Sequence, residues 1–160
     1  MGFREKIINY SRGDNLQLFW RLFYMRKRTK NTLMKSALAF WCSRLAQKHG
    51  GYLGVGAEVE KRPSLPHGLH GIYISRYASI GAGCRIYQNV TLGEIEQKAP
   101  KIGKNCLIGA GAVLVGDITI GENVKIGAGA VVFTDIPDNS TVVSQPPRIL
   151  TKELEGSSIC

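Results

Sequence analysis

Two histidines in one short loop are the residues of this sequence best suited to acid–base chemistry. His67 and His70 stand in the segment 66–71, and His67 lies between Pro66 and Gly68, which leave its ring uncrowded. A histidine titrates near neutral pH, so its neutral ring can take the proton from an attacking hydroxyl. His67 is the candidate general base and His70 the reserve candidate, and an exposed loop histidine without a role is the alternative.

A second loop, 93–99, carries carboxylates that could assist such a base. Glu94 or Glu96 could hold the imidazole in one tautomer by accepting its second N–H, as could a backbone carbonyl. Both glutamates could equally be solvated loop residues. The backbone N–H near Gly93 is a candidate donor to the oxygen of a tetrahedral intermediate, since glycine permits close approach.

The elements that position these loops follow from a six-residue period. Apolar anchors recur every six residues, with one interruption after Leu92, at Ile74, Ile80, Ile86, Leu92, Ile102, Ile108, Leu114, Ile120, Ile126 and Val132. Leu53, Val59 and Leu65 keep the same step in a different phase. This period predicts a parallel β-helix of about four coils, in which each hexapeptide forms one side and glycines occupy tight corners.

The two interruptions of the period coincide with the two loops. A change of phase must leave the coil as a loop, because shifted anchors would bury polar side chains. One such loop is 66–71, with both histidines, and the other is 93–99, with both glutamates. Loops that project from a rigid scaffold commonly carry function.

The cysteines do not fit a metal site or a disulfide scaffold. Cys42, Cys84, Cys106 and Cys160 include no Cys-x-x-Cys pair and have no metal-type spacing with the histidines. Cys84 and Cys106 stand four places after an anchor, which faces the coil interior. We therefore expect packed thiols, with nucleophilic cysteines as the alternative, and a reducing compartment.

The charge of the 160-residue chain is concentrated in its first third. Residues 1–50 carry eleven Lys/Arg and two Asp/Glu, whereas residues 51–160 carry ten of each, for a net charge of +9. Neither a signal peptide nor an apolar run long enough to span a bilayer is visible, so we expect a cytoplasmic protein. The division predicted is a basic helical segment at 1–50, a β-helix at 51–137 and an exit segment at 138–160.

The first segment has two apolar stripes at helical spacing. Leu16, Phe19, Trp20, Phe23 and Tyr24 form the first, and Leu33, Ala37, Phe40, Trp41 and Leu45 form the second. These stripes could pack on the end of the β-helix or between subunits. Alternatively, the basic segment could lie on an anionic membrane at the inner face of the cell membrane. Nucleic acid is not expected, because the chain has no recognised reading module.

The β-helical part resembles the hexapeptide-repeat acyltransferases, whose fold is a left-handed β-helix. Within them it is most similar to the serine acetyltransferases and the bacterial polysaccharide O-acetyltransferases. The similarity covers about residues 53–150 and rests on Ile86–Gly93 (IYQNVTLG), Ala99–Gly103 (APKIG), Ile108–Ala112 (IGAGA) and Ile126–Ala130 (IGAGA). The exit Asp135-Ile136-Pro137 and the segment 146–149 (PPRI) are also similar.

The resemblance implies a homotrimer that binds acetyl-CoA between neighbouring coils. It implies direct transfer of the acetyl group to an acceptor hydroxyl, with His67 as the catalytic base and without a metal. The backbone amides of Ala110 and Ala128 take the positions that contact the coenzyme. Lys125, Arg148 and Lys152 are candidates to meet its phosphates, although surface solubility explains them equally well.

The acceptor implied is a hydroxyl compound of one of two kinds. Serine acetyltransferases usually have an Asp before the first His and a second His before the Pro-Lys-Ile-Gly segment. Here these positions hold Pro66 and Ala99. The sequence therefore favours a sugar of a cell-surface polysaccharide or its precursor, with L-serine as the alternative. A non-catalytic trimeric scaffold is the hypothesis from another class.

Overall fold

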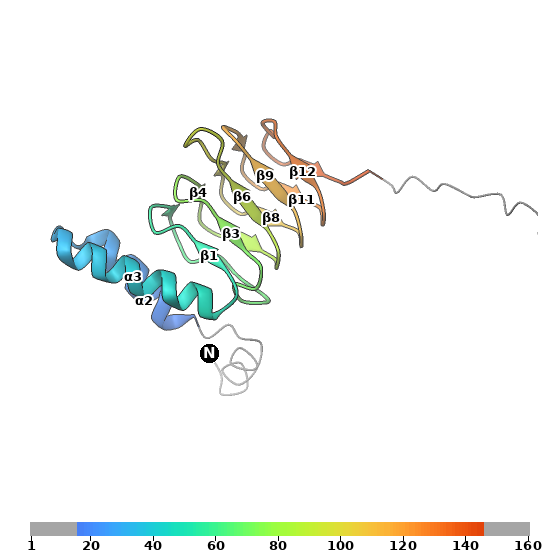
Figure 1. Ribbon diagram of the computed structural model, residues 1–160. Helices are drawn as coiled ribbons and strands as arrows, with labels where there is room; N and C mark the ends of the chain where they lie inside the picture. Colours follow the sequence, from blue (N-terminus) through green and yellow to red (C-terminus); the bar gives the residue numbers. More distant parts are fainter. Residues whose placement is uncertain (1–15, 146–160) are drawn as a thin grey trace, which may run out of the picture.

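The computed structural model describes residues 16–145, which form a β-helix with a helical hairpin at its N-terminal end (Figure 1). The hairpin consists of α2 (Gln17–Arg28) and α3 (Thr32–Lys48). Arg148, Lys152 and Cys160 lie outside the described residues. The β-helix begins at Tyr52 and continues to Val142, so it extends beyond the predicted exit at 137 through a last strand, β13 (Thr141–Val142).

Three parallel sheets form the sides of the β-helix, and we name them faces A, B and C. Face A has five strands: β1 (Tyr52–Leu53), β3 (Tyr73–Ile74), β6 (Thr91–Gly93), β9 (Val113–Val115) and β12 (Val131–Val132). Face B has four: β2 (Glu58–Val59), β4 (Ser79–Ile80), β7 (Lys101–Ile102) and β10 (Thr119–Ile120). Face C has β5 (Arg85–Ile86), β8 (Leu107–Ile108), β11 (Lys125–Ile126) and β13.

The predicted anchors are the inward residues of these short strands, which confirms the predicted six-residue period. Each anchor from Ile74 to Val132 is at least 95% buried and pairs in register with the anchor of the next coil, as Ile80 does with Ile102. Two-residue strands suffice because each side of the coil needs one inward and one outward residue. The core is therefore a column of stacked aliphatic side chains, whose burial from water stabilises the fold.

The turns from face C to face A stack into one edge, which we name the C/A edge (residues 66–71, 87–89, 109–111 and 127–129). Equivalent positions of the four turns have a left-handed backbone: Gly71, Asn89, Gly111 and Gly129, with φ between 58° and 69°. Glycine and asparagine tolerate this conformation better than other residues. Both predicted loops are present. The loop 66–71 belongs to this edge, and the loop 94–99 projects from the opposite side of face A.

The first helix packs as predicted, with its aromatic stripe against the end of the coil. Phe19, Trp20 and Phe23 are buried, and their rings contact one another at centroid distances of 5.1–6.0 Å. Arg26 and Lys27 donate hydrogen bonds to the carbonyl oxygens of Val55 and Val59. This helix therefore covers the apolar end that the first coil would otherwise expose.

The second stripe does not pack in the way its spacing suggests, and here the structure corrects the sequence reading. The buried residues of α3 are Leu38, Cys42 and Ala46, whereas Phe40 and Trp41 are 59% and 58% exposed. The aromatic rings of α2 already fill the space beside the coil, so α3 approaches through a face with small residues. Neither helix of the described residues is long and apolar enough to cross a membrane.

Candidate active site

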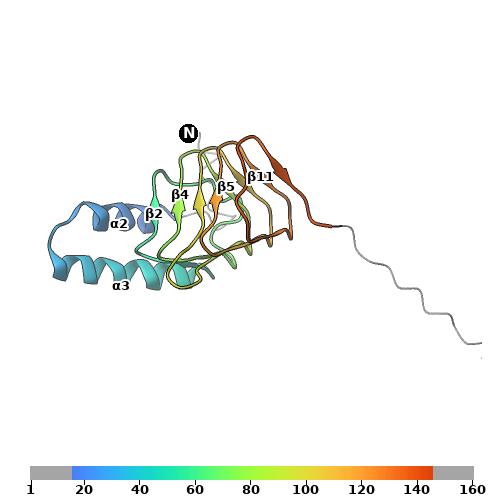
Figure 2. The same cartoon turned by 90° about the horizontal axis from the view of Figure 1, so that it is seen from above.

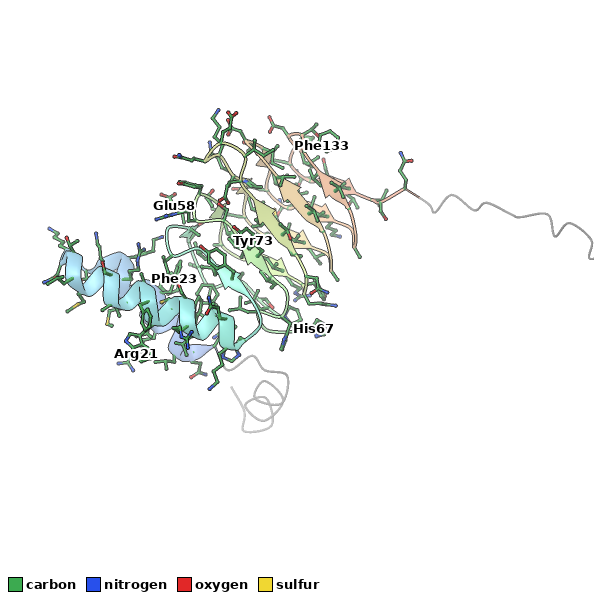
Figure 3. The ribbon with its side chains drawn as sticks, viewed as in Figure 1. Arg21, Phe23, Glu58, His67, Tyr73 and Phe133 are labelled. Atoms are coloured by element: carbon green, nitrogen blue, oxygen red, sulfur yellow. The ribbon has the colours of Figure 1, made fainter. Side chains whose placement is uncertain are left out.

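The predicted base lies on the C/A edge, beside an aromatic ring from the next coil. His67 is exposed, and its ring centroid lies 6.0 Å from that of Tyr87 at an interplanar angle of 48°. Figure 3 shows His67 at the margin of the coil, away from the interior. The ring is thus open to a ligand approaching this edge and rests against Tyr87 on one side.

Backbone hydrogen bonds align the turns of this edge along the coil axis. Asn89 donates to the carbonyl of His70, Gly111 to that of Gln88, and Gly129 to that of Ala110, at 3.0, 3.0 and 2.8 Å. Four successive turns are therefore stacked, and they carry His67, Tyr87, Ala110 and Ala128 in that order. The structure thus places the predicted base and both predicted coenzyme-contact positions on the same edge of the coil.

The glycines of this edge serve the stacking of coils. A Cβ added to Gly109 would lie 2.6 Å from the amide nitrogen of Ala128 and 2.8 Å from the carbonyl oxygen of Ile126. A Cβ on Gly111 or Gly129 would meet nothing within 4 Å. Gly109 therefore permits close approach of two backbones, and its neighbours leave open space beside Ala110 and Ala128.

Glu94, Glu96 and Gly93 lie on the other side of face A, so one chain does not bring them to His67. Ile95 and Lys98 pair in a small hairpin, with Glu96 and Gln97 at its tip in left-handed conformation. Lys98 forms an ion pair of 2.8 Å with Asp117 of the next coil. The orienting role of the two glutamates stays a prediction that needs a neighbouring chain.

The same holds for the proposed donor near Gly93. A Cβ on Gly93 would lie 2.7 Å from Cγ1 of Val115, so packing of adjacent coils already requires glycine here. Glu94 affects Tyr73, whose pKa is raised by partial desolvation and by the nearby glutamate charge. Tyr73 is thus the residue of face A that faces this hairpin.

Face C carries two cations beside the C/A edge. Lys125 and Arg85 occupy the same outward position in register with Leu107, which lies between them. Arg85 was not predicted as a coenzyme contact, although it precedes its anchor in the repeat as Lys125 does. Lys125 is on the strand that leads into the turn of Ala128, and Arg85 is on the strand that pairs with β8, which leads into the turn of Ala110.

Tyr87 and Gln88 are further residues of this edge that sequence reasoning missed. They follow the anchor Ile86 as the Gly-Ala pairs follow Ile108 and Ile126, so the repeat register could have identified them. The Oε1 atom of Gln88 is buried without a hydrogen-bond partner. A buried acceptor is costly when unpaired, so this atom is a polar group of the edge whose hydrogen bonding the described residues do not satisfy.

The two cysteines of the β-helix are packed in the coil interior as predicted. Cys84 and Cys106 are buried, and their thiols donate to the carbonyls of Gly103 and Gly121 at 3.2 and 3.0 Å. The hydrogen bond with Cys106 and burial raise the pKa of Cys84. Among residues 16–145, no cluster of three His, Cys, Asp or Glu side chains could hold a metal ion.

Comparison with known proteins finds similarity to a family of transferases over part of the chain. Residues 99–134 match the model of the bacterial transferase hexapeptide, six repeats. This stretch of the chain carries the hexapeptide repeat. Serine acetyltransferases of Staphylococcus xylosus and Staphylococcus aureus are each 43% identical to it over 102 residues, which cover 61% of this chain and 47% of theirs. The chain thus spans about half the length of the curated relatives it matches.

Solved structures confirm the left-handed β-helix fold. The structure of Neisseria gonorrhoeae serine acetyltransferase in complex with serine aligns with a TM-score of 0.71 at 32% identity, covering 82% of this chain and 55% of that one. Soybean serine acetyltransferase complexed with serine aligns at 0.66 and 34%, covering 81% and 53%. The hexapeptide-repeat chain therefore shares the fold and the repeat of acetyltransferases.

Proposed function

We propose that this hexapeptide-repeat protein is an acetyl-CoA-dependent O-acetyltransferase. The observation that carries the proposal is the C/A edge, where His67 and the turns of Ala110 and Ala128 lie on one line parallel to the coil axis. The similarity to serine acetyltransferases supports the same reaction class.

The reaction would be a direct transfer. His67 removes the proton of the acceptor hydroxyl as its oxygen attacks the thioester carbonyl of acetyl-CoA. The tetrahedral intermediate then expels the CoA thiolate, which takes the proton from the His67 ring. The amides at Ala110 and Ala128 would contact acetyl-CoA, and Lys125 and Arg85 would lie near its phosphates. The interior position of Cys84 and Cys106 argues against a covalent thiol intermediate.

L-serine is the first acceptor to test, because the matched relatives are named serine acetyltransferases. A sugar hydroxyl of a cell-surface polysaccharide or its precursor is the second, and two positions favour it. Pro66 cannot supply a carboxylate beside His67, and Ala99 is buried with no polar group to offer. L-serine would therefore have to be held by groups other than those two.

A homotrimer that packs through face A is part of the proposal. The outward row of this face is uncharged along its whole length: Tyr52, Tyr73, Thr91, Val113 and Val131. Head-to-tail packing of such faces around a threefold axis would bring the 94–99 hairpin of one chain towards the C/A edge of the next. Glu94 or Glu96 could then reach His67 of the neighbour.

The proposed location is the cytoplasm, with peripheral contact at the inner face of the cell membrane through the basic helical segment. Nothing in the proposed chemistry requires this contact. Acetyl transfer and membrane contact can therefore be tested in separate experiments.

Release of CoA thiol tests the function. Acetyl-CoA is incubated with L-serine or with a sugar acceptor, using the wild-type chain, His67→Ala and His70→Ala. We expect loss of a general base to lower kcat by about 10²–10⁴-fold in His67→Ala while acetyl-CoA binding persists. His70→Ala should change kcat little.

The acceptor that stimulates release identifies the substrate class. Full activity of His67→Ala together with loss of activity in His70→Ala would identify His70 as the general base. Absence of acetyl-CoA binding by the wild-type chain would leave the non-catalytic scaffold as the function.

A further inference from the structure

The outer face of α3 is an exposed surface that combines large apolar side chains with cations. We define it by Leu33, Met34, Ala37, Phe40, Trp41, Arg44 and Lys48. Leu33 is 82% exposed, Met34 50%, Phe40 59% and Trp41 58%. Solvent-facing side chains of this size are normally scattered singly, and a contiguous set marks an interaction site.

Helical geometry places these residues on one side of α3. Leu33, Ala37, Phe40, Trp41, Arg44 and Lys48 follow the three- and four-residue steps of a single helix face. The rings of Phe40 and Trp41 contact edge to face at a centroid distance of 5.7 Å. The apolar part occupies the first three turns, and Arg44 and Lys48 continue the same side.

The charge of the surroundings points to an anionic occupant. Residues 16–50 contain eight Lys/Arg and no Asp or Glu, whereas residues 51–145 contain eight of each sign. The helical hairpin, including the turn that holds Lys30, thus carries the whole charge surplus of the described residues. Cations beside aromatic and aliphatic side chains on one helix are typical of segments that lie in the headgroup region of anionic bilayers.

The position of the hairpin leaves this surface open. Figures 1 and 2 show α2 and α3 projecting from the N-terminal end of the β-helix, side by side in both views. Leu38, Cys42 and Ala46 are the buried residues of α3, and Cys42 and Ala46 belong to the same core as the aromatic cluster of α2. The opposite side of α3 can therefore meet a flat surface without any change in the core.

We propose that the outer face of α3 docks on an anionic lipid bilayer surface, with Phe40 and Trp41 inserted at headgroup level and the cations against lipid phosphates. A second copy of this chain is disfavoured as the occupant, because two such hairpins would bring together eight cations from each copy. The proposal concerns binding alone and does not depend on acetyl transfer.

Trp41 provides a direct probe of the docking. The chain contains two tryptophans, and Trp20 is buried in α2 with its indole N–H unpartnered. Trp20→Phe removes that unpaired donor and leaves Trp41 as the sole emitter. The full chain carrying Trp20→Phe is titrated with vesicles of phosphatidylglycerol and phosphatidylcholine, and separately with phosphatidylcholine alone.

We expect the Trp41 emission to shift to shorter wavelength with the anionic vesicles only, and the shift to reverse at high salt. In co-sedimentation, Phe40→Ser should weaken vesicle binding at least tenfold. Phe133→Ser is the matched control, because Phe133 is 72% exposed at the far end of the coil (Figure 3). Arg44→Glu should likewise weaken binding, and Lys101→Glu on face B should not.

Two outcomes would overturn the proposal. One is unchanged emission and no co-sedimentation of a folded wild-type chain with anionic vesicles. The other is a change of oligomeric mass in Phe40→Ser without vesicle binding by wild type, which would make the outer face of α3 a contact between copies. Sedimentation equilibrium of wild type and both serine variants distinguishes these results.

Discussion

Replacement of Gly109 by alanine tests whether the C/A edge depends on close approach of two backbones. The added Cβ would stand 2.6 Å from the amide nitrogen of Ala128, whereas ordinary contact begins at 3.4 Å. The difference is 0.8 Å, and every atom within 3 Å belongs to backbone. Adjacent coils would therefore have to separate locally.

The cost follows from that separation. Gly109 donates to the carbonyl of Ile126 at 2.8 Å, and the same shift would lengthen this hydrogen bond beyond about 3.5 Å. A lost backbone hydrogen bond costs about 1 kcal/mol, and overpacking of a dense interior typically costs about 1–3 kcal/mol. Together these terms predict that the free energy of unfolding falls by about 2–4 kcal/mol in Gly109→Ala.

Guanidinium unfolding at one fixed protein concentration measures this loss, because subunit association would contribute to stability. With a slope of about 4 kcal/mol/M, the midpoint should fall by about 0.5–1 M. Acetyl-CoA affinity should fall by about tenfold, since the Ala128 amide moves. Gly111→Asn is the control: Asn89 holds the equivalent position with φ 58°, so this variant should stay within about 0.5 kcal/mol of wild type.

Unchanged unfolding and unchanged acetyl-CoA affinity in Gly109→Ala would refute the argument that coil contact positions Ala128. Equal losses in Gly109→Ala and Gly111→Asn would refute it as well, since backbone conformation rather than crowding would then dominate.

Two further predictions concern stability. The pKa of His49 is lowered by partial burial and by the charges of Lys48 and His70, so the fold favours the neutral ring. The contribution of His49 to the free energy of unfolding should be fully present above its unfolded pKa of about 6.5. This contribution should be lost as the pH falls through the lowered pKa of the folded chain. Replacement of His49 by Asn should flatten this acid dependence, and equally steep loss in both chains would show that another group is responsible. Leu92→Ala removes a fully buried anchor and should cost about 3–5 kcal/mol in denaturant unfolding, whereas Thr119→Ala, at an exposed outward position of face B, should cost less than about 0.5 kcal/mol. Similar costs for the two would contradict the assignment of inward and outward positions.

The coil could be predicted from the sequence because its period is local. Each anchor, such as Ile102 or Ile126, can be recognised as an inward residue from its place in the six-residue period. The interruptions of the period identify both loops. His67, Ala110 and Ala128 share one edge because equivalent repeat positions must stack. The same logic applied to Ile86 would have placed Tyr87 and Gln88 beside them.

Other features depend on contacts that no period encodes. Phe40 and Trp41 have the spacing of a buried stripe, yet α3 is buried through Cys42 and Ala46, because the rings of α2 already occupy the space. No local sequence pattern relates Glu94 to His67 in space, because the width of face A separates them. Such distances depend on which side of a coil each loop leaves and on how chains assemble.

Because the turns of the C/A edge are stacked, the spacing between equivalent residues along this edge is fixed by the number of coils between them. Strands of neighbouring coils are about 4.8 Å apart, so the three steps from the turn of His67 to that of Ala128 amount to about 14 Å. Distance between functional groups can therefore change only in whole coils of eighteen residues, because any other insertion leaves as a loop. Evolution or design could lengthen or shorten the reach along this edge by adding or removing one coil, with the chemistry at each end unaltered.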